Sequence, residues 1–432
     1  MHVLYLNKRL PLFVALLAVV SVGAPTVAAY SQQADPTPRR QQKPPAKPQQ
    51  RPQTAGKPAP VKTEALPPSQ IGVGTLAKQA FMVDPQTSTV LLFKDADKPM
   101  HPSSMAKMMT IHLLFDELAA GRVTLDTRYR VSDRARAMGG SRMFLDVGTE
   151  VRIEDLIRGM IVQSGNDACV VVAEGISGTE EAFAERMNKR AREIGMTGTV
   201  FKNASGWPVD GQITTARDIA LLAWHTISTY PKYYRYYSET EMTYNNIHQD
   251  NRNRVLKTTP GADGLKTGHT DAAGYGIAVS AKRGDQRLIL ILNGLRYPQY
   301  KNDYFPNIRR AEEAVRVMEM AFREFRSYPV LATNQVIGTV PVLEGKLPSV
   351  PATAAQPLNV TMQVESRTGM KTQLRPMPGL TAPIHVGQRV GTLVITAPEF
   401  PALSVPVYAS QSVAKTGFFG GWWNSVKRMI GS

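Results

Sequence analysis

A serine and a lysine spaced three residues apart introduce a long apolar segment of this sequence. Ser104 and Lys107 open a run that is apolar on nearly every side through residue 118, which is typical of a buried helix. Ser104 would then lie at the helix N-terminus, where free N–H groups favour developing negative charge. Lys107 would lie one turn further on the same face, and partial desolvation would lower its pKa. This spacing predicts a serine nucleophile with a lysine base.

The Ser-x-x-Lys pattern is not specific by itself. A chain of this length should contain roughly one or two matches by chance, given ordinary residue usage. The sequence has a second match, from Ser412 to Lys415, close to its C-terminal end. The context must therefore decide which of the two matches forms a site.

A second hydroxyl and an amide occur at Ser164 and Asn166, in a break between two apolar segments. These segments, residues 153–162 and 166–175, are predicted helices, and a loop between them can direct side chains into a cleft. A hydroxyl near the lysine can relay a proton, and an amide can orient a peptide substrate. The structural alternative is a serine and an asparagine that cap a helix.

A third group of chemically useful residues lies at the end of a predicted strand, residues 263–266, and before a predicted hairpin. This group is Lys266, Thr267, Gly268 and His269. A strand edge can pair with an extended peptide, and glycine allows its backbone to approach closely. A cation beside a hydroxyl suits a substrate that ends in a carboxylate, and Lys266 would help to keep Lys107 neutral. The tail repeats this pattern from Lys415 to Gly417, but that lysine would have to serve both patterns, so the tail cannot form the site.

The elements that must position these residues can be predicted coarsely. Residues 76–83 and 88–94 read as a hairpin, and a helix capped by Thr215 covers residues 219–227. Strand-like runs at 274–282 and 286–293 precede an amphipathic helix at 308–325. Short apolar runs then predict a small all-β domain, at residues 335–342, 358–364, 388–396 and 404–408.

The composition and the two ends of the chain indicate where in the cell the protein would be found. The 432 residues carry a net charge of +16, and the excess of basic over acidic residues is greatest towards the ends. Residues 1–29 read as a signal peptide, 30–68 as a Pro-rich disordered linker, and 411–432 as an amphipathic tail for a membrane surface. Basic ends favour anionic lipid headgroups over nucleic acid, because no nucleic-acid-binding signature accompanies them. The single cysteine, Cys169, excludes an intrachain disulfide.

Taken in this order, the three patterns resemble the signature of penicillin-recognising serine acyl-enzymes. Their surroundings are similar to the low-molecular-mass penicillin-binding proteins that are D-alanyl-D-alanine carboxypeptidases. The resemblance implies an α/β (α+β) fold with a central antiparallel sheet flanked by helices. We expect a catalytic domain at residues 69–328 and a β-sandwich-like domain at 329–410. The resemblance further implies an enzyme that removes the terminal D-alanine from peptidoglycan stem peptides, binds β-lactams covalently and needs no cofactor or metal.

The resemblance also implies a role for each residue. Ser104 would attack the peptide carbonyl, Lys107 would accept its proton, and Ser164 would pass a proton to the leaving amine. The substrate would be bound by residues of all three patterns and by two further arginines: Asn166, Lys266, Thr267, Gly268, His269, Arg252 and Arg296. The backbone N–H groups of Ser104 and His269 would stabilise the oxyanion, each contributing roughly 3–4 kcal/mol.

Three other functions fit parts of this sequence less well. A β-lactamase would need an additional carboxylate, which residues 203–208 do not supply. A D,D-endopeptidase would perform the same chemistry on peptide cross-links, but such enzymes usually lack the β domain and the tail. A non-catalytic peptidoglycan-binding scaffold would not need every catalytic position to be filled. We therefore expect an exported, peripheral enzyme on the periplasmic face of the bacterial inner membrane.

Overall fold

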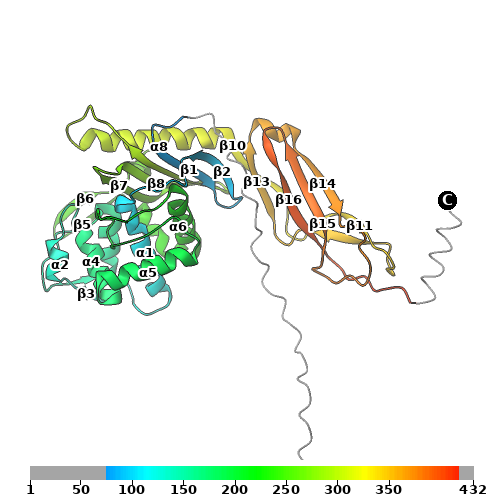
Figure 1. Ribbon diagram of the computed structural model, residues 1–432, viewed down its shortest axis with the longest axis horizontal. Coiled ribbons are helices and arrows are strands. Elements are labelled where there is room, and N and C mark those ends of the chain that lie inside the picture. The colour runs from blue at the N-terminus through cyan, green and yellow to red at the C-terminus, as the bar shows by residue number, and fades with distance from the viewer. Residues whose placement is uncertain (1–73, 418–432) are drawn as a thin grey trace, which may run out of the picture. The chain divides into compact units, whose positions relative to one another are not determined.

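The structure is a computed structural model that describes residues 74–417 (Figure 1). The predicted signal peptide, the linker and most of the predicted tail lie outside the described residues. Five strands form one antiparallel sheet in the order β2-β1-β9-β8-β7. Their bounds are β1 Gln79–Asp84, β2 Thr89–Lys94, β7 Ala262–Thr270, β8 Gly274–Arg283 and β9 Gln286–Leu295.

Helices cover both faces of this sheet (Figure 1). One face packs against α8 (Tyr304–Glu324), through strand residues such as Met82 and Leu290. The other face, which includes Phe81 and Ile291, packs against a helical cluster. Alternate strand residues therefore reach different cores. The remaining helices are α1 Lys107–Ala119, α2 Asp133–Ala137, α3 Ile153–Arg158, α4 Asn166–Ser177, α5 Glu180–Glu193, α6 Ala216–Thr229 and α7 Pro231–Tyr234.

Short elements complete this part of the chain. Helical turns occur at η1 Ser103–Ala106, η2 Gly159–Gln163, η3 Arg235–Ser238 and η4 Arg254–Lys257. Two small antiparallel pairs join β3 (Arg128–Arg130) to β4 (Glu150–Arg152), and β5 (Glu241–Tyr244) to β6 (Ile247–Asp250). The sequence patterns predicted neither pair, because their strands are short and mostly exposed.

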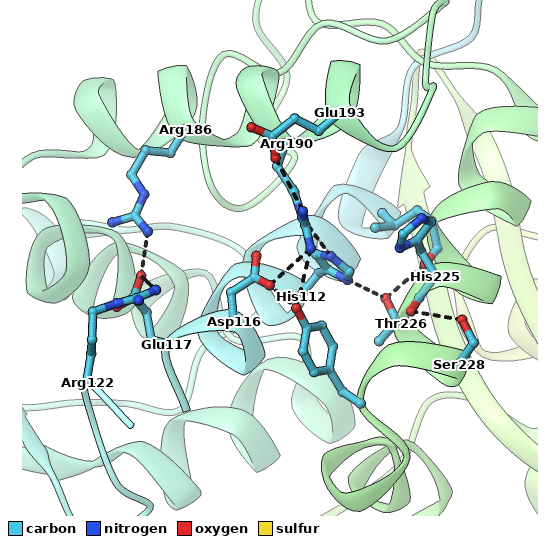
Figure 2. Close-up of polar contacts among 12 residues, drawn as sticks. His112, Asp116, Glu117, Arg122, Arg186, Arg190, Glu193, His225, Thr226 and Ser228 are labelled. Carbon is cyan, nitrogen blue, oxygen red and sulfur yellow. Dashed lines mark hydrogen bonds and ion pairs between the residues drawn. The ribbon is translucent and has the colours of Figure 1, made fainter. Parts of the chain in front are cut away.

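Helix α1 is buried on nearly all sides, as its sequence predicts, and a polar network holds its far half (Figure 2). The His112 ring contacts the Thr226 hydroxyl of α6 through Nδ1, at 2.9 Å, and Nε2 accepts from Nε of Arg190 on α5, at 3.2 Å. Arg190 also pairs with Asp116 at 3.1 Å. Burial, reinforced by the charge of Arg190, lowers the pKa of His112 to about 3, so its ring is neutral at physiological pH.

The C-terminal region is all β, as predicted. Five strands form a sheet in the order β11-β12-β16-β15-β14, and β10 pairs separately with β13. Valine, isoleucine and leucine side chains form its core, including Val350, Ile395 and Val407. The bounds are β10 Phe325–Leu331, β11 Val336–Pro341, β12 Ser349–Thr353, β13 Leu358–Gln363, β14 Lys371–Pro376, β15 Arg389–Ala397 and β16 Phe400–Ala409, with the turn η5 at Glu365–Gly369.

Candidate active site

Ser104 lies in the tight turn η1 that leads into α1, so it comes just before the α-helix rather than in it. The residue before it, Ser103, has a φ of 48°, in the left-handed region that L-residues rarely adopt. Gly206 makes this conformation possible, since a Cβ there would lie 1.8 Å from the Ser103 carbonyl oxygen. Ser104 is half-buried, and its hydroxyl remains accessible while the turn around it is fixed.

Lys107 is fully buried and contacts three oxygen atoms. Its Nζ lies 3.0 Å from Oγ of Ser104, 2.7 Å from Oδ1 of Asn166 and 2.6 Å from the carbonyl oxygen of Ser205. The amide oxygen and the carbonyl oxygen can only accept hydrogen bonds. They therefore take the two N–H groups of a neutral amine, and its lone pair is left for the Ser104 hydroxyl. Burial lowers the pKa of Lys107 to about 8, and the charge of Arg252 acts in the same direction.

The Ser164–Asn166 pattern lies where two helices meet, as predicted, but the first helix ends differently. Helix α3 stops at Arg158, and the single wide turn η2 follows it. Such turns are frequent at functional sites. Ser164 then adopts a φ of 64° and Asn166 begins α4, which directs both side chains towards the lysines. The Asn166 amide also donates to the carbonyl oxygen of Gly139 at 2.8 Å.

The residue after this pattern, Asp167, fixes the loop that contains Met143 and Leu145. The sequence analysis missed this role. Its carboxylate accepts from the backbone N–H groups of Met143, at 2.9 Å, and Leu145, at 3.3 Å. A charged residue at the start of the apolar run 168–173 was the signal that could have identified it. Asp167 therefore positions the loop that supports Asn166.

The Lys266–Gly268 pattern lies within β7 and not at a strand end, which corrects the predicted strand of residues 263–266. β7 extends further because every residue from Gly264 to Thr270 pairs with β8. It is the last strand of the sheet, so its other side is available to an extended peptide. The missing side chain of Gly268 leaves room for Ser103, since a Cβ there would lie 3.1 Å from that of Ser103.

Lys266 connects this strand to Ser164. Its Nζ donates to the Ser164 hydroxyl and to the Thr267 carbonyl oxygen, both at 3.0 Å. Burial lowers the pKa of Lys266 well below its usual value, and the positive charges of Lys107 and Arg252 lower it further. Each serine of the site is thus paired with a lysine. The expected help from Lys266 is not among the main influences on the Lys107 pKa, where burial dominates.

The two predicted arginines have different environments. Arg252 is exposed, but its charge lowers the pKa values of both lysines, so it lies near the site. Arg296 instead donates to the carbonyl oxygens of Asp271 and Ala272, at 3.1 and 2.8 Å, and supports the turn after β7. The His269 ring stacks on Tyr275, with 3.9 Å between the ring centroids.

The sequence analysis also missed Arg310, which is only 2% exposed. Its guanidinium donates to the carbonyl oxygen of Gly268, at 3.3 Å, and to that of Arg252, at 3.5 Å. Among residues 74–417 it has no carboxylate partner, and its Nε has no hydrogen-bond partner. Its position on α8, four residues before the buried Ala314, was the available signal.

This geometry supports acyl transfer. Ser104 lies within hydrogen-bond distance of a lysine whose neutral form is favoured, which is the arrangement of an activated nucleophile. Ser164 supplies a second hydroxyl, and Lys266 and Arg310 supply positive charge along β7 for an anionic group. Arg252 adds to this charge, and the charge of Arg296 reaches His269 on the same strand, where it lowers the pKa of the ring.

Comparison with known proteins agrees with this arrangement. Residues 65–295 match the family described as D-alanyl-D-alanine carboxypeptidase (peptidase S11), and residues 325–415 match the penicillin-binding protein 5 C-terminal domain. The chain is 33% identical to D-alanyl-D-alanine carboxypeptidase DacF of Bacillus subtilis, over 79% of this chain and 87% of that protein.

Two solved structures are also similar. Penicillin-binding protein 5 of Haemophilus influenzae has a TM-score of 0.72 and 30% identity, over 79% of this chain and 99% of that one. Penicillin-Binding Protein D2 of Listeria monocytogenes, in its ampicillin-bound form, has a TM-score of 0.52 and 27% identity. That match covers 58% of this chain and 98% of the Listeria chain.

Proposed function

The chain belongs to the D-alanyl-D-alanine carboxypeptidase family, and we propose that Ser104, Lys107 and Ser164 carry out the hydrolysis of the terminal D-Ala-D-Ala bond of peptidoglycan stem peptides. The observation that carries this proposal is the coordination of Lys107. Two fixed acceptors hold its N–H groups while Ser104 Oγ lies 3.0 Å from the nitrogen. A neutral amine held in this way is a base aimed at the serine hydroxyl.

The reaction proceeds in two halves. Ser104 Oγ attacks the carbonyl carbon of the penultimate D-alanine, and its proton passes to Lys107. Ser164 delivers its proton to the leaving nitrogen and is reprotonated with the proton that Lys107 took up, the peptide bond breaks, and free D-alanine departs from a Ser104 ester. Water then attacks this ester and gives its proton to Lys107, which returns it to Ser104 Oγ as the shortened peptide leaves with a new carboxylate.

We assign substrate recognition to the positively charged residues of the site and to Asn166. The terminal carboxylate meets Lys266 and the Thr267 hydroxyl on β7, with Arg310 and Arg252 close by. Arg310 is a buried cation that lacks a carboxylate partner among the described residues, and an anionic ligand would supply one. Asn166 holds the substrate amide, and the N–H groups of Ser104 and His269 are assigned to the oxyanion.

β-Lactams are inhibitors under this proposal. They present a reactive amide and a carboxylate in the same relation as the substrate, so Ser104 forms an ester that the site releases slowly. The ampicillin-bound relative from Listeria supports this part of the proposal.

The proposed location is the periplasmic face of the inner membrane, with peripheral attachment through residues 411–432. The basic and apolar pattern of residues 1–29 and the two tryptophans of the tail, Trp422 and Trp423, support it. Among residues 74–417, no helix is both long enough and apolar enough to cross a bilayer. Membrane flotation of the full chain, beside a chain ending at residue 410, tests this attachment.

The catalytic assignment is tested by D-alanine release from a stem pentapeptide. The full chain should release D-alanine, and Ser104→Ala should not release it or form a penicillin ester. Ser412→Ala, in the second Ser-x-x-Lys pattern, is the matched control and should retain both reactions. If the unmodified chain forms the ester but releases no D-alanine, the substrate assignment is wrong and cross-linked peptides become the next substrate to test.

A further inference from the structure

Three side chains of kinds that bind metal ions lie together on the β5–β6 hairpin (Figure 1). One ligand atom from each of Glu241, His248 and Asp250 lies within 4.8 Å of the other two. All three residues are exposed, so an ion from solution can reach them. Within residues 74–417, no other group of three or more such side chains is placed to hold a metal ion.

The backbone of the hairpin places these side chains on one face. β5 and β6 are antiparallel, with Glu241 opposite Asp250 and Thr243 opposite His248. Side chains two residues apart on a strand share a face, so all four of these residues lie on the same side of the hairpin. The other side carries Met242, which is buried in the helical core. This packing keeps the face with the three possible ligands turned towards solvent.

The charges on this face favour the binding of a cation. Glu241 and Asp250 are directly opposite each other, and like charges in such a cross-strand pair destabilise a hairpin. Lys257 pairs with Asp250 at 2.8 Å, but the pair is exposed and such pairs contribute little. Within residues 74–417, the Glu241 carboxylate forms no ion pair or hydrogen bond. A divalent cation between the two carboxylates would replace their repulsion with attraction.

The donor set indicates the class of ion. Zn²⁺ binds imidazole nitrogen and carboxylate oxygen at about 2.0–2.2 Å, and three protein ligands with one water form a common tetrahedral site. Donors in such a tetrahedron are about 3.4 Å apart, and rotation of exposed side chains can bring the ligand atoms to this separation. Nδ1 of His248 lies 3.4 Å from the Thr243 hydroxyl, which leaves Nε2 for the ion. Mg²⁺ and Ca²⁺ instead prefer sites that contain only oxygen ligands.

We propose that Glu241, His248 and Asp250 bind one divalent transition-metal ion of the Zn²⁺ class, with a fourth coordination position open to water. The ion would join β5 to β6 just before Arg252, which lines the same pocket as Asp250. This inference goes beyond the proposed function and does not depend on it, because none of the three ligands takes part in the proposed hydrolysis.

The test is a calorimetric titration of the metal-free full chain with ZnSO₄. We expect Zn²⁺ to bind at this site, and excess MgCl₂ should not displace it, because imidazole is a poor ligand for Mg²⁺. X-ray absorption of the Zn²⁺-loaded chain should show nitrogen and oxygen donors at about 2.0–2.2 Å and no sulfur.

Variants assign the binding to the three ligands. Glu241→Gln, His248→Gln and Asp250→Asn should each weaken Zn²⁺ binding roughly tenfold or more, since even the loss of a group that only orients a ligand can have an effect of this size. His385→Gln, which changes an exposed histidine of the C-terminal β region, is the matched control and should bind Zn²⁺ as the unmodified chain does. Thermal unfolding of the four variants without metal verifies that they fold.

Three outcomes would overturn the proposal. The first is a full chain that does not bind Zn²⁺. The second is Zn²⁺ binding that is unchanged in all three ligand variants, because the ion would then be bound elsewhere. The third is displacement of Zn²⁺ by Mg²⁺, or an X-ray absorption spectrum without a nitrogen donor, because either result would exclude the His248 ring as a ligand.

Discussion

The protonation of Lys107 should control the rate of acylation, and this can be measured. Its pKa of about 8 lies about 2.5 units below the ordinary value of 10.5, and each unit corresponds to about 1.4 kcal/mol. The folded site thus favours the neutral amine by roughly 3 kcal/mol. At pH 7 about one tenth of the molecules have a neutral Lys107, about 300-fold more than for an ordinary lysine.

The pH profile follows from this value. Acylation by a fluorescent penicillin should accelerate about tenfold per pH unit below pH 8 and level off above it, because the neutral amine accepts the proton. Arg252→Gln removes a positive charge that disfavours the ammonium form, so the pKa of Lys107 and the midpoint should rise. Arg252→Lys preserves the charge and should keep the midpoint.

The assay is the second-order rate constant of acylation between pH 6 and 10, with only the midpoint compared between variants. Lys107→Arg is the control for the base itself, since a guanidinium stays protonated throughout this range and should abolish acylation. A rate constant that does not change between pH 6 and 9 would refute the assignment of Lys107 as the base. If the pH profile of the unmodified chain has its midpoint near 10.5, burial does not lower the pKa of Lys107.

Three further predictions follow from buried groups. Arg310→Met should raise KM for the pentapeptide at least tenfold, measured by D-alanine release, and should change the melting temperature only slightly, because the loss of two hydrogen bonds to carbonyl oxygens is offset by the removal of a buried cation that has no carboxylate partner. His112→Gln should make the protein less sensitive to acid. In the unfolded chain His112 takes up a proton below about pH 6.5, whereas the folded ring stays neutral down to about pH 3, so protonation of this residue favours unfolding between these pH values. Without it, the decrease in unfolding free energy from pH 7 to pH 5, measured with urea, should be smaller by about 2 kcal/mol. Gly206→Ala should lower the free energy of unfolding by more than the roughly 1–2 kcal/mol expected for a strained φ, and should slow acylation, because its Cβ would meet the Ser103 carbonyl. Gly211→Ala is the control, since a Cβ there has ordinary contacts, and in the same melting experiment it should show only the destabilisation due to the strained φ.

The residues that carry the chemistry were accessible from the sequence because their signals are local. Ser104 and Lys107 are one helical turn apart, and the apolar run after them predicts burial, from which a lowered pKa follows. The break that contains Ser164 is equally local. The strand that contains Phe81 and Met82 and the strands of the C-terminal region are short apolar runs bounded by turn residues, so the sheet and the all-β region were also predictable.

What the sequence did not reveal depends on contacts between distant segments. Gly206 matters because it meets Ser103, about one hundred residues away, and nothing in the surrounding sequence indicates this contact. Arg310 reaches Gly268 only because α8 packs across the sheet. Arg296 was expected near the carboxylate by resemblance, and the contacts of its guanidinium with the turn after β7 could not be read from the sequence. Periodicity can predict that an element is buried, but not which residue of another element it meets.

The charges of the site explain why a carboxylate-ended substrate would bind to it. Lys107 and Lys266 are both buried, and no carboxylate in residues 74–417 forms an ion pair with either of them. Two ammonium groups in this environment disfavour each other, so protonation of one promotes deprotonation of the other. A substrate carboxylate beside Lys266 stabilises the ammonium form of that lysine, and the ion pair so formed has no net charge. The substrate would thus bind without placing a second net positive charge beside Lys107, whereas a peptide with an amidated C-terminus would lose this ion pair and bind more weakly.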